Sequence, residues 1–416
     1  MILTPTSVSA AAAIRAQTGF DAVIQAARLV IDGHYGRDWR ALAPQIGLAD
    51  HQVRLLERIT YSPNWWRIAR PDTVFVGDQP KFLELNLIAS IGGLAISDLL
   101  VRCLRAWPVG SDWLATNPLR FLDTMAALAA DVRTASVRPD DLTVVTRWGP
   151  YELENMPPHF YRALAGEFTR GGLPTTHASI VEIDWDGQYP RLRGERIGCL
   201  YRFFDESDES LPAKQKLFDK LLGHVERGTV GLYGDFVSDA VLNKAFVARL
   251  SQWLAADAGQ LRSLPEPARR ALAAVLPWSR VVEAGRTTDP AGQQVDLLEY
   301  LRRSQPEIIL KPAHGFSGAD VLVGRTTSPQ RWQAALKQAG ATGQRWVAQQ
   351  FFAVPPQPVI RVWRGRLVGG KYRTVTGLFF VAGRFAGGIC RAAPARRYVV
   401  NPSRGAAQGA FGVQPA

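Results

Sequence analysis

A segment near residue 311 combines a lysine with a glycine-rich loop, and this combination suits the binding of phosphate groups. Residues 307–323 have the β-branched character of two buried strands, joined by a loop with two glycines. Glycine lets backbone N–H groups approach a phosphate closely, and Lys311, one strand length before the loop, can neutralise phosphate oxygens. We therefore predict nucleotide-binding contacts from Lys311, Gly315, Ser317 and Gly318.

Other interpretations compete for the same segment. An ordinary hairpin with a glycine-rich tip fits it about as well when the segment is taken alone. A Walker loop is excluded because its spacing of glycines, lysine and hydroxyl residue is absent. Residues 315–319 resemble the nucleophile elbow of hydrolases, but that motif needs a helix after the serine, and residues 319–323 read as a strand.

Candidate metal ligands lie near the opposite end of the chain. Nucleoside triphosphate chemistry requires a divalent cation held by oxygen ligands, yet the 96 residues after Asp320 contain no aspartate or glutamate. Glu84 and Asn86 lie two residues apart on an apolar strand, so both face the same side. A three-residue loop at 77–79 would set Asp72 opposite Glu84 as a third magnesium ligand. A loop with an even number of residues would not bring Asp72 opposite Glu84, and Asp72 would then have a role in a turn or as a helix cap.

The charge is unevenly distributed along the chain. The formal net charge is +12, but the part after Asp320 carries fourteen Lys and Arg, which gives +14 there and −2 elsewhere. These cations lie on strand-like apolar segments, which favours a folded site for a compact polyanion over a flexible nucleic-acid tail. A solvated basic face is the alternative interpretation.

The elements that must position these residues alternate between helical and strand-like patterns. Helices are predicted at 8–60, 92–132, 158–170 and 213–276, and strands at 72–86, as a hairpin, at 142–146, at 179–184 and from about 307 onward.

Length and composition predict a globular protein of more than one domain. The chain has 416 residues, of which 47% are apolar, and no run approaches the roughly 18 apolar residues of a membrane span. The N-terminus lacks the features of a secretion signal, so a cytoplasmic location is expected. Cys103, Cys199 and Cys390 are far apart, which indicates neither a disulfide framework nor a thiolate metal site.

Taken in order along the chain, these segments resemble the circularly permuted ATP-grasp proteins, the group that includes glutathionylspermidine synthetase. The matching pieces are the E-x-N strand at Glu84, the tyrosine–arginine segment 197–202, the N-K pair at 243–244, the loop after Lys311, the glutamine-bearing strand 346–351 and the hairpin 359–370. Each piece alone is weak, but their common order makes coincidence improbable. The lack of acid after Asp320 is what permutation would produce.

The resemblance implies a role for each matched position. Lys244 and Lys311 would contact the nucleotide phosphates, Gln349 and Gln350 the adenine, Arg361 the transferred phosphate, and Arg391 and Asn401 the region of the acyl phosphate. The expected catalytic residues are therefore Arg361, Arg391 and Lys311. The strand 346–351 lacks the acidic residue often present in the family, and no substrate-binding segment can be matched.

The implied fold is an α/β (α+β), ATP-grasp-like and circularly permuted architecture of antiparallel sheets flanked by helices, with a helical N-terminal region. Its expected parts are residues 1–135, a helical region that carries the metal-ligand hairpin 72–86; residues 136–210, a central α/β domain; and residues 211–416, a helical segment followed by the ATP-grasp nucleotide-binding subdomains.

The implied function is an ATP-dependent carboxylate–amine ligase that uses ATP and Mg²⁺. A substrate carboxylate would attack the γ-phosphate, and an amine would then displace the phosphate to form an amide. The expected partners are small-molecule or peptide carboxylates and amines, with no membrane, and nucleic acid is not the expected partner; the oligomeric state is open, with a homodimer among the options.

Three alternatives are kept. The first is an ATP-grasp-type phosphotransferase, and the second is a basic nucleic-acid-binding protein in which Trp346 and Trp363 stack on bases. The third is a non-catalytic relative that acts as a partner protein, which the intact Glu84 and Lys311 argue against. His314 is the one histidine that merits testing as a base, with a plain role at the loop rim as its alternative.

Overall fold

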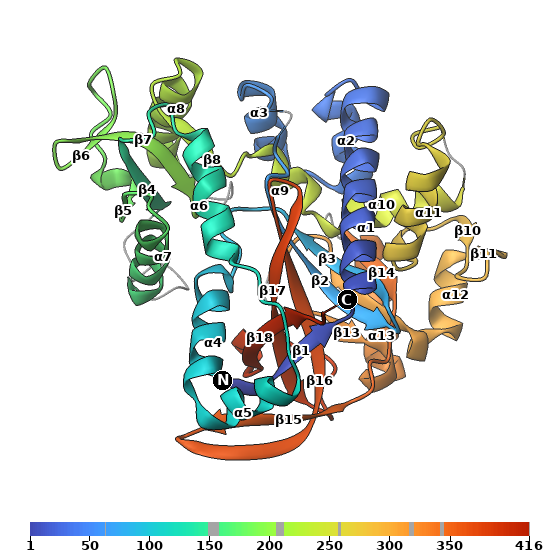
Figure 1. The fold of residues 1–416 in the computed structure, drawn as a ribbon. Helices are drawn as coiled ribbons and strands as arrows, with labels where there is room; N and C mark the ends of the chain where they lie inside the picture. Colours follow the sequence, from blue (N-terminus) through green and yellow to red (C-terminus); the bar gives the residue numbers. More distant parts are fainter. Residues whose placement is uncertain are drawn as a thin grey trace.

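The chain folds as a mixed α/β protein, which confirms the predicted class at that level. The structure is a computed structural model that describes residues 1–62, 64–148, 158–204, 212–256, 259–315, 320–341 and 345–415. Within this part, three larger sheets are covered by helices (Figure 1).

The largest sheet unites strands from both ends of the chain. Its seven strands follow the order β15-β1-β18-β17-β16-β2-β3. Their bounds are β1 Ile2–Val8, β2 Ile68–Val76, β3 Gln79–Asn86, β15 Gln357–Trp363, β16 Arg366–Val381, β17 Arg384–Pro394 and β18 Ala407–Val413. The first part of β16 pairs with β15 and its last part with β2, so the early hairpin β2–β3 extends a sheet built mostly from C-terminal residues. The strand β1, which precedes the helices predicted from residue 8, was not anticipated.

The hairpin β2–β3 has the predicted position but not the predicted turn. Val76 pairs directly with Gln79, so the turn has two residues, not three, and on its own would leave Asp72 out of register with Glu84. A β-bulge corrects the count, because Leu83 is an extra residue between two paired positions. Asp72 therefore does lie opposite Glu84, as predicted, although for a different reason.

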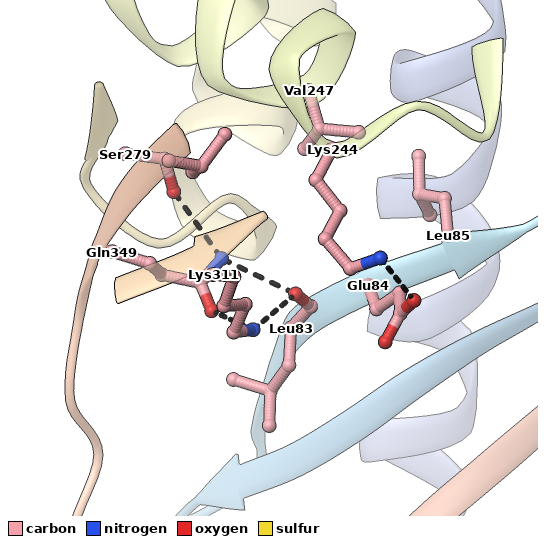
Figure 2. A pocket seen from close by; sticks show the side chains of 9 residues that line it. Leu83, Glu84, Leu85, Lys244, Val247, Ser279, Lys311 and Gln349 are labelled. Atoms are coloured by element: carbon pink, nitrogen blue, oxygen red, sulfur yellow. Dashed lines mark hydrogen bonds and ion pairs between the residues drawn. The ribbon is translucent and has the colours of Figure 1, made fainter. Parts of the chain in front are cut away.

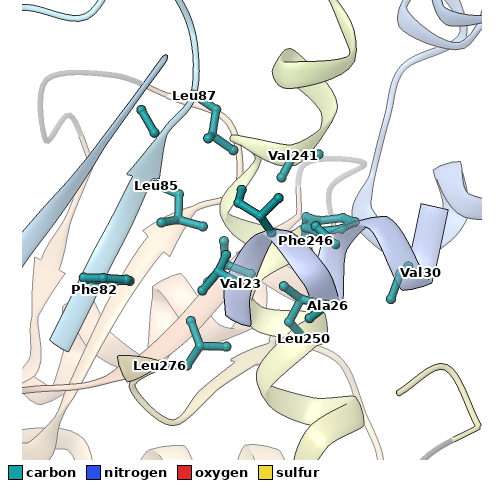
Figure 3. Packing of buried hydrophobic residues seen from close by; sticks show 14 of the residues in the cluster. Val23, Ala26, Val30, Phe82, Leu85, Leu87, Val241, Phe246, Leu250 and Leu276 are labelled. Carbon is teal, nitrogen blue, oxygen red and sulfur yellow. The ribbon is translucent and has the colours of Figure 1, made fainter. Parts of the chain in front are cut away.

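One face of the large sheet is covered by helices from the predicted helical regions. These helices are α1 Ala10–Arg28, α2 Trp39–Ile46, α3 Asp50–Arg58, α9 Val237–Val241, α10 Lys244–Ala255 and α11 Glu266–Val275, with a π-helical turn at Leu29–His34. Ser9 caps α1 by accepting from the backbone of Ala12. Figure 3 shows Val23 of α1 and Phe246 of α10 packed beside Leu85 of β3 in one apolar core.

The opposite face packs against a second set of helices and a small parallel sheet, and the last of these helices lies on the far side of that small sheet. The helices are α4 Leu94–Ala106, α5 Pro108–Thr116, α6 Thr124–Ala135, α7 Pro158–Arg170 and α8 Pro212–Glu226; the strands are β4 Leu142–Arg147, β5 Thr175–Ser179, β6 Arg191–Leu192, β7 Glu195–Arg202 and β8 Gly231–Tyr233. Strands β5, β4, β7 and β8 run parallel, and β6 pairs antiparallel with β7.

The predicted strand at 179–184 is wrong. Strand β5 ends at Ser179, which accepts a hydrogen bond from Val181 N, while the Glu182 carboxylate accepts from Ser179 N. This reciprocal cap starts a 3₁₀ turn at Ile180–Glu182, so local side-chain bonds outweigh the β-branched character of the segment.

A third sheet, of four antiparallel strands, carries the lysine-bearing segment. Its order is β13-β12-β14-β9, with β9 Ser279–Val281, β12 Ile308–Pro312, β13 Leu322–Val323 and β14 Trp346–Gln350; α12 Leu297–Arg303, α13 Pro329–Ala341 and the hairpin β10 Arg286–Thr288 and β11 Gln294–Asp296 adjoin it. The strand-loop-strand prediction at 307–323 is confirmed by the pairing of Leu310 with Leu322. A search of the described helices finds none with the length and apolar character needed to cross a bilayer.

Candidate active site

A small pocket forms where β3 of the large sheet meets the third sheet and the start of α10. It is lined by Leu83, Glu84, Leu85, Lys244, Val247, Ser279, Lys311, Val347 and Gln349. Figure 2 shows the side chains of Lys244 and Lys311 pointing toward β3 from two different elements. The free space is about 10 Å³, which is room for about one water molecule.

Lys311 is held in a polar pocket although it is almost fully buried. Its Nζ donates to the Gln349 Oε1 atom at 2.7 Å and to the Leu83 carbonyl at 3.2 Å. The Gln349 amide in turn donates to that carbonyl and to Ser279 Oγ, both at 3.2 Å. Burial lowers the pKa of Lys311 to about 8, although the nearby Glu84 carboxylate opposes the shift. Since an ammonium has three donors, one remains for another acceptor.

Lys244 faces the same pocket from the first residue of α10. Its Nζ lies 3.0 Å from Glu84 Oε1 and donates to the Gly315 carbonyl at 2.7 Å. The helix begins here because the side chain of Asn243 accepts from Ala245 N, while its amide group donates to the Ile46 carbonyl at 2.8 Å. This cap positions the lysine between the glycine loop and the carboxylate on β3.

A second charged group lies beside the pocket on the large sheet. Arg391 Nη2 lies 2.6 Å from Asp72 Oδ1, and Arg70 Nε donates to the same oxygen at 3.0 Å. Burial alone would raise the pKa of the Asp72 carboxyl, but Arg391 and Arg70 outweigh it and hold the pKa below its usual range. The Arg391 contact is close but poorly aligned, and within the described residues its Nε has no hydrogen-bond partner.

Gly377 allows this arrangement. It lies opposite Asp72 on β16, and a Cβ atom there would come within 2.6 Å of Arg70 Cδ. The Arg70 side chain can therefore cross the strand only because no side chain occupies position 377.

The predicted magnesium ligands do lie together. Asp72 and Glu84 form a directly opposed pair, and Asn86 is opposed to Arg70 two residues further along the same strands. Two carboxylates and one amide oxygen on one sheet face are the hard oxygen donors that Mg²⁺ takes. Both carboxylates already pair with cationic side chains, so an ion would compete with Lys244 for Glu84 and with Arg391 and Arg70 for Asp72; the types of donor atom fit the ion.

Other predicted residues lie elsewhere. Gln350 is adjacent to Gln349 and therefore faces the other side of β14, and it does not line the pocket. Arg361 lies on β15, where its guanidinium packs over the rings of Trp363 and Tyr372 at 4.9 and 5.4 Å. The roles assigned to these two residues stay predictions.

The glycine loop is described only in part. Gly315 adopts a φ of 137°, a conformation that favours glycine, whereas Ser317 and Gly318 lie outside the described residues. His314 Nε2 lies 2.9 Å from the Asn243 amide nitrogen and 3.2 Å from the Gly47 carbonyl, which favours a structural role at the loop rim. Asn401 caps the 3₁₀ turn at Pro402–Arg404.

Sequence reasoning missed three groups in or beside the pocket. The position of the Leu83 carbonyl depends on the bulge, and no residue type in this segment predicts a bulge. Ser279 begins a strand of only three residues, which is too short for a periodic signal. Arg70 could have been found, since it lies two residues before Asp72 and therefore on the same face of the strand.

Comparisons with known proteins find similarity in part of the sequence and in the fold. No protein-family model matches the chain. Over 251 residues it is 24% identical to a Frankia alni protein named "Putative glutamate--cysteine ligase 2-3"; the match covers 57% of this chain and 26% of that protein, so the chain spans about a quarter of the relative's length.

Solved structures define the fold more fully. A glutathione synthetase-like effector from Globodera pallida, in its apo form, aligns over 99% of this chain and 90% of its own with a TM-score of 0.58 and 11% identity. A structure named "Putative gamma-glutamylcysteine synthetase" from Methylobacillus flagellatus covers the same shares at a TM-score of 0.46 and 13% identity. The alignment with the Globodera pallida protein shows that the chain has a fold similar to that of this glutathione synthetase-like protein.

Proposed function

We propose that this protein is an ATP-dependent carboxylate–amine ligase of the circularly permuted ATP-grasp type. The observation that carries the proposal is the convergence of Lys244 and Lys311 on Glu84 between two sheets. Burying two lysines and one carboxylate from three separate segments costs folding free energy. The same groups are suited to binding a metal–polyphosphate complex.

The lysines would bind the nucleotide phosphates. Lys311 is buried and fixed by Gln349, so its charge is little screened by water and would act strongly on a phosphate. The pocket between β3 and the third sheet has room for about one water molecule, so a phosphate group that enters it would take the place of contacts that now close it. The contacts that would break are those of Lys244 with Glu84 and of Lys311 with the Leu83 carbonyl.

Asp72, Glu84 and Asn86 would hold Mg²⁺. The ion would supply charge neutralisation at the phosphate oxygens during transfer. Asp72 and Glu84 contribute negative charge from adjacent strands, and the fixed register of the bulged hairpin sets their separation.

Arg391 and Arg70 would orient the anionic groups that react. A substrate carboxylate oxygen would attack the γ-phosphorus of ATP, the bond to ADP would break, and an acyl phosphate would form. The amine nitrogen would then attack the carbonyl carbon, lose a proton and expel inorganic phosphate, leaving an amide. Because no protein nucleophile is needed, the side chains contribute position and charge.

The comparisons support a ligase of this kind. The named relative is a glutamate–cysteine ligase by its printed name, and the aligned structure is glutathione synthetase-like. Both names concern the joining of amino acids or small peptides, which favours amino-acid or peptide carboxylates and small amines as substrates here.

The test is a product analysis. The protein is incubated with MgATP and a panel of amino acids, small peptides and polyamines, and released ADP is measured together with the mass of any condensed product. A condensed amide formed with one ADP per bond is the expected result. A stable phosphate ester would instead establish the alternative phosphotransferase, and no ATP turnover with any pair would contradict both.

A further inference from the structure

The hairpin formed by β15 and the first part of β16 carries a basic and aromatic surface outside the pocket, and this surface includes Arg361, for which the resemblance implied a contact with the transferred phosphate. We name residues 357–371 the basic arm. None of them lines the pocket, and in Figure 1 the arm runs along the bottom of the view, well below β3 and β14.

The basic arm is exposed to an unusual degree for a paired segment. Its strands pair residue by residue up to Trp363 and Arg366, at the turn. Ile360, Trp363 and Leu367 are 37%, 53% and 51% exposed, and they lie on both faces of the ribbon. Strand β15 also borders β1 of the large sheet, yet these large apolar side chains remain exposed, which indicates a surface for contact.

The charges of the arm lack internal partners. It contains Arg361, Arg364, Arg366 and Lys371 and no acidic residue. Throughout the described ranges, no carboxylate forms an ion pair with any of these four cations. By contrast, Arg345 in the same basic part of the chain lies 3.5 Å from Glu283. The arm therefore presents four uncompensated positive charges to its surroundings.

Aromatic rings separate these cations. The Arg361 and Arg364 guanidiniums lie 4.9 and 5.8 Å from the ring of Trp363, and Arg361 also packs over Tyr372. Stacking on the rings holds the Arg361 side chain in place although its buried Nε has no hydrogen-bond partner among the described residues. The half-exposed indole is thus a rigid flat group between positive charges.

We infer that the basic arm docks single-stranded nucleic acid, with its cations on the phosphates and Trp363 stacked on a base. The charge complements a polyanion, and the exposed indole favours a single strand among polyanions. Each of its nucleotides offers an aromatic face beside a phosphate, whereas Asp and Glu side chains carry no ring and a duplex hides its base faces. The other tryptophan considered for this role, Trp346, is only 6% exposed and cannot stack on a base.

The test measures binding of a fluorescent oligo-dT of about 20 nucleotides to the full chain by anisotropy over a salt series. Contact with four phosphates predicts a slope of log affinity against log salt of about −3, from roughly 0.7 per phosphate. Arg364→Ala combined with Arg366→Ala should reduce that slope by about 1.4. Trp363→Ala should weaken binding about fivefold or more through lost stacking.

Matched controls distinguish the arm from general basicity. Arg302→Ala with Arg303→Ala removes two exposed arginines from the last turn of α12, and Trp107→Ala removes an indole that is 38% exposed; both should bind like the parent protein. Circular dichroism confirms that each variant is folded. Equal losses in the controls, unchanged binding by Trp363→Ala, or equally tight binding of duplex or polyglutamate would overturn the inference.

Discussion

Replacing Glu84 by glutamine should change nucleotide binding in opposite directions with and without metal. In the structure, Lys244 is paired with this carboxylate at 3.0 Å, and the side chains are 12% and 27% exposed. Without Mg²⁺, a nucleotide must take Lys244 away from Glu84 and then face the repulsion of an unpaired carboxylate. The substitution Glu84→Gln removes both penalties while keeping the shape of the side chain.

The size of the effect follows from the geometry. Unit charges 3.0 Å apart attract by about 5 kcal/mol at an effective dielectric constant near 20. Desolvation offsets most of this, and partly buried pairs have a net value of about 1–2 kcal/mol. We therefore expect Glu84→Gln to bind ATP about tenfold more tightly in EDTA, while Mg²⁺-dependent turnover falls by about 100-fold or more through loss of a metal ligand.

Calorimetric titration of ATP in EDTA and a coupled ADP-release assay in Mg²⁺ measure the two quantities. Asp78→Asn is the matched control, because Asp78 lies on the same hairpin and forms an exposed ion pair with Arg15 at 3.5 Å; it should change neither. Metal-free affinity that is unchanged or weaker in Glu84→Gln would refute the idea that the carboxylate restrains Lys244.

Three further predictions concern single positions. Burial lowers the pKa of Lys311 to about 8, so above that pH the lysine loses its charge and ATP affinity should fall by up to tenfold per pH unit. Lys311→Met should bind ATP weakly and without this pH dependence. Titration calorimetry between pH 7 and 9.5 measures both affinities. Burial and a neighbouring carboxyl raise the pKa of Asp98 to about 6. Between pH 4 and 6 the folded state therefore binds a proton that the unfolded state does not, and stability is lost as pH rises through that window. Asp98→Asn should add about 1–2 kcal/mol to the free energy of unfolding at pH 7 and nothing below pH 4, as measured by urea denaturation. Gly377→Ala places a Cβ atom 2.6 Å from Arg70 Cδ and should lower turnover about tenfold or more, whereas Gly369→Ala, where a Cβ atom meets nothing within 4 Å, should leave turnover unchanged.

The sequence predicted the parts of the site that depend on local pattern. Alternation placed Glu84 on a strand beside Asn86, and the lysine followed by two glycines identified the strand-loop-strand at Lys311. The absence of acid after Asp320 correctly indicated that these two segments have to meet. The first two inferences needed only residue types and spacing within a few positions, and the third needed the composition of the last 96 residues.

What the sequence could not predict depends on counts and contacts between distant segments. The extra residue at Leu83 shifts the strand register, and no unusual residue type marks it. Because a regular hairpin was assumed, the prediction needed a three-residue turn to bring Asp72 opposite Glu84, and that turn length was wrong. The prediction of a strand at 179–184 was wrong because the hydrogen bonds between Ser179 and Glu182, which cap a 3₁₀ turn, compete with β-pairing. The strand β1 gains its place from pairing with β18 at the other end of the chain, which no local window contains.

The bulge at Leu83 makes a main-chain oxygen part of the candidate site. Both Lys311 and Gln349 donate to the Leu83 carbonyl, an atom that every amino acid supplies, so alanine scanning of β3 would miss it. Deleting Leu83 is the informative change, because the two-residue turn would then pair the following glutamate with Asp72 in regular register. Such a protein would keep every ionisable group of the site and lose only the oxygen that aims the buried lysine. Homologues that share this feature should keep the number of residues in the β2–β3 hairpin constant, while the residue type at position 83 can vary.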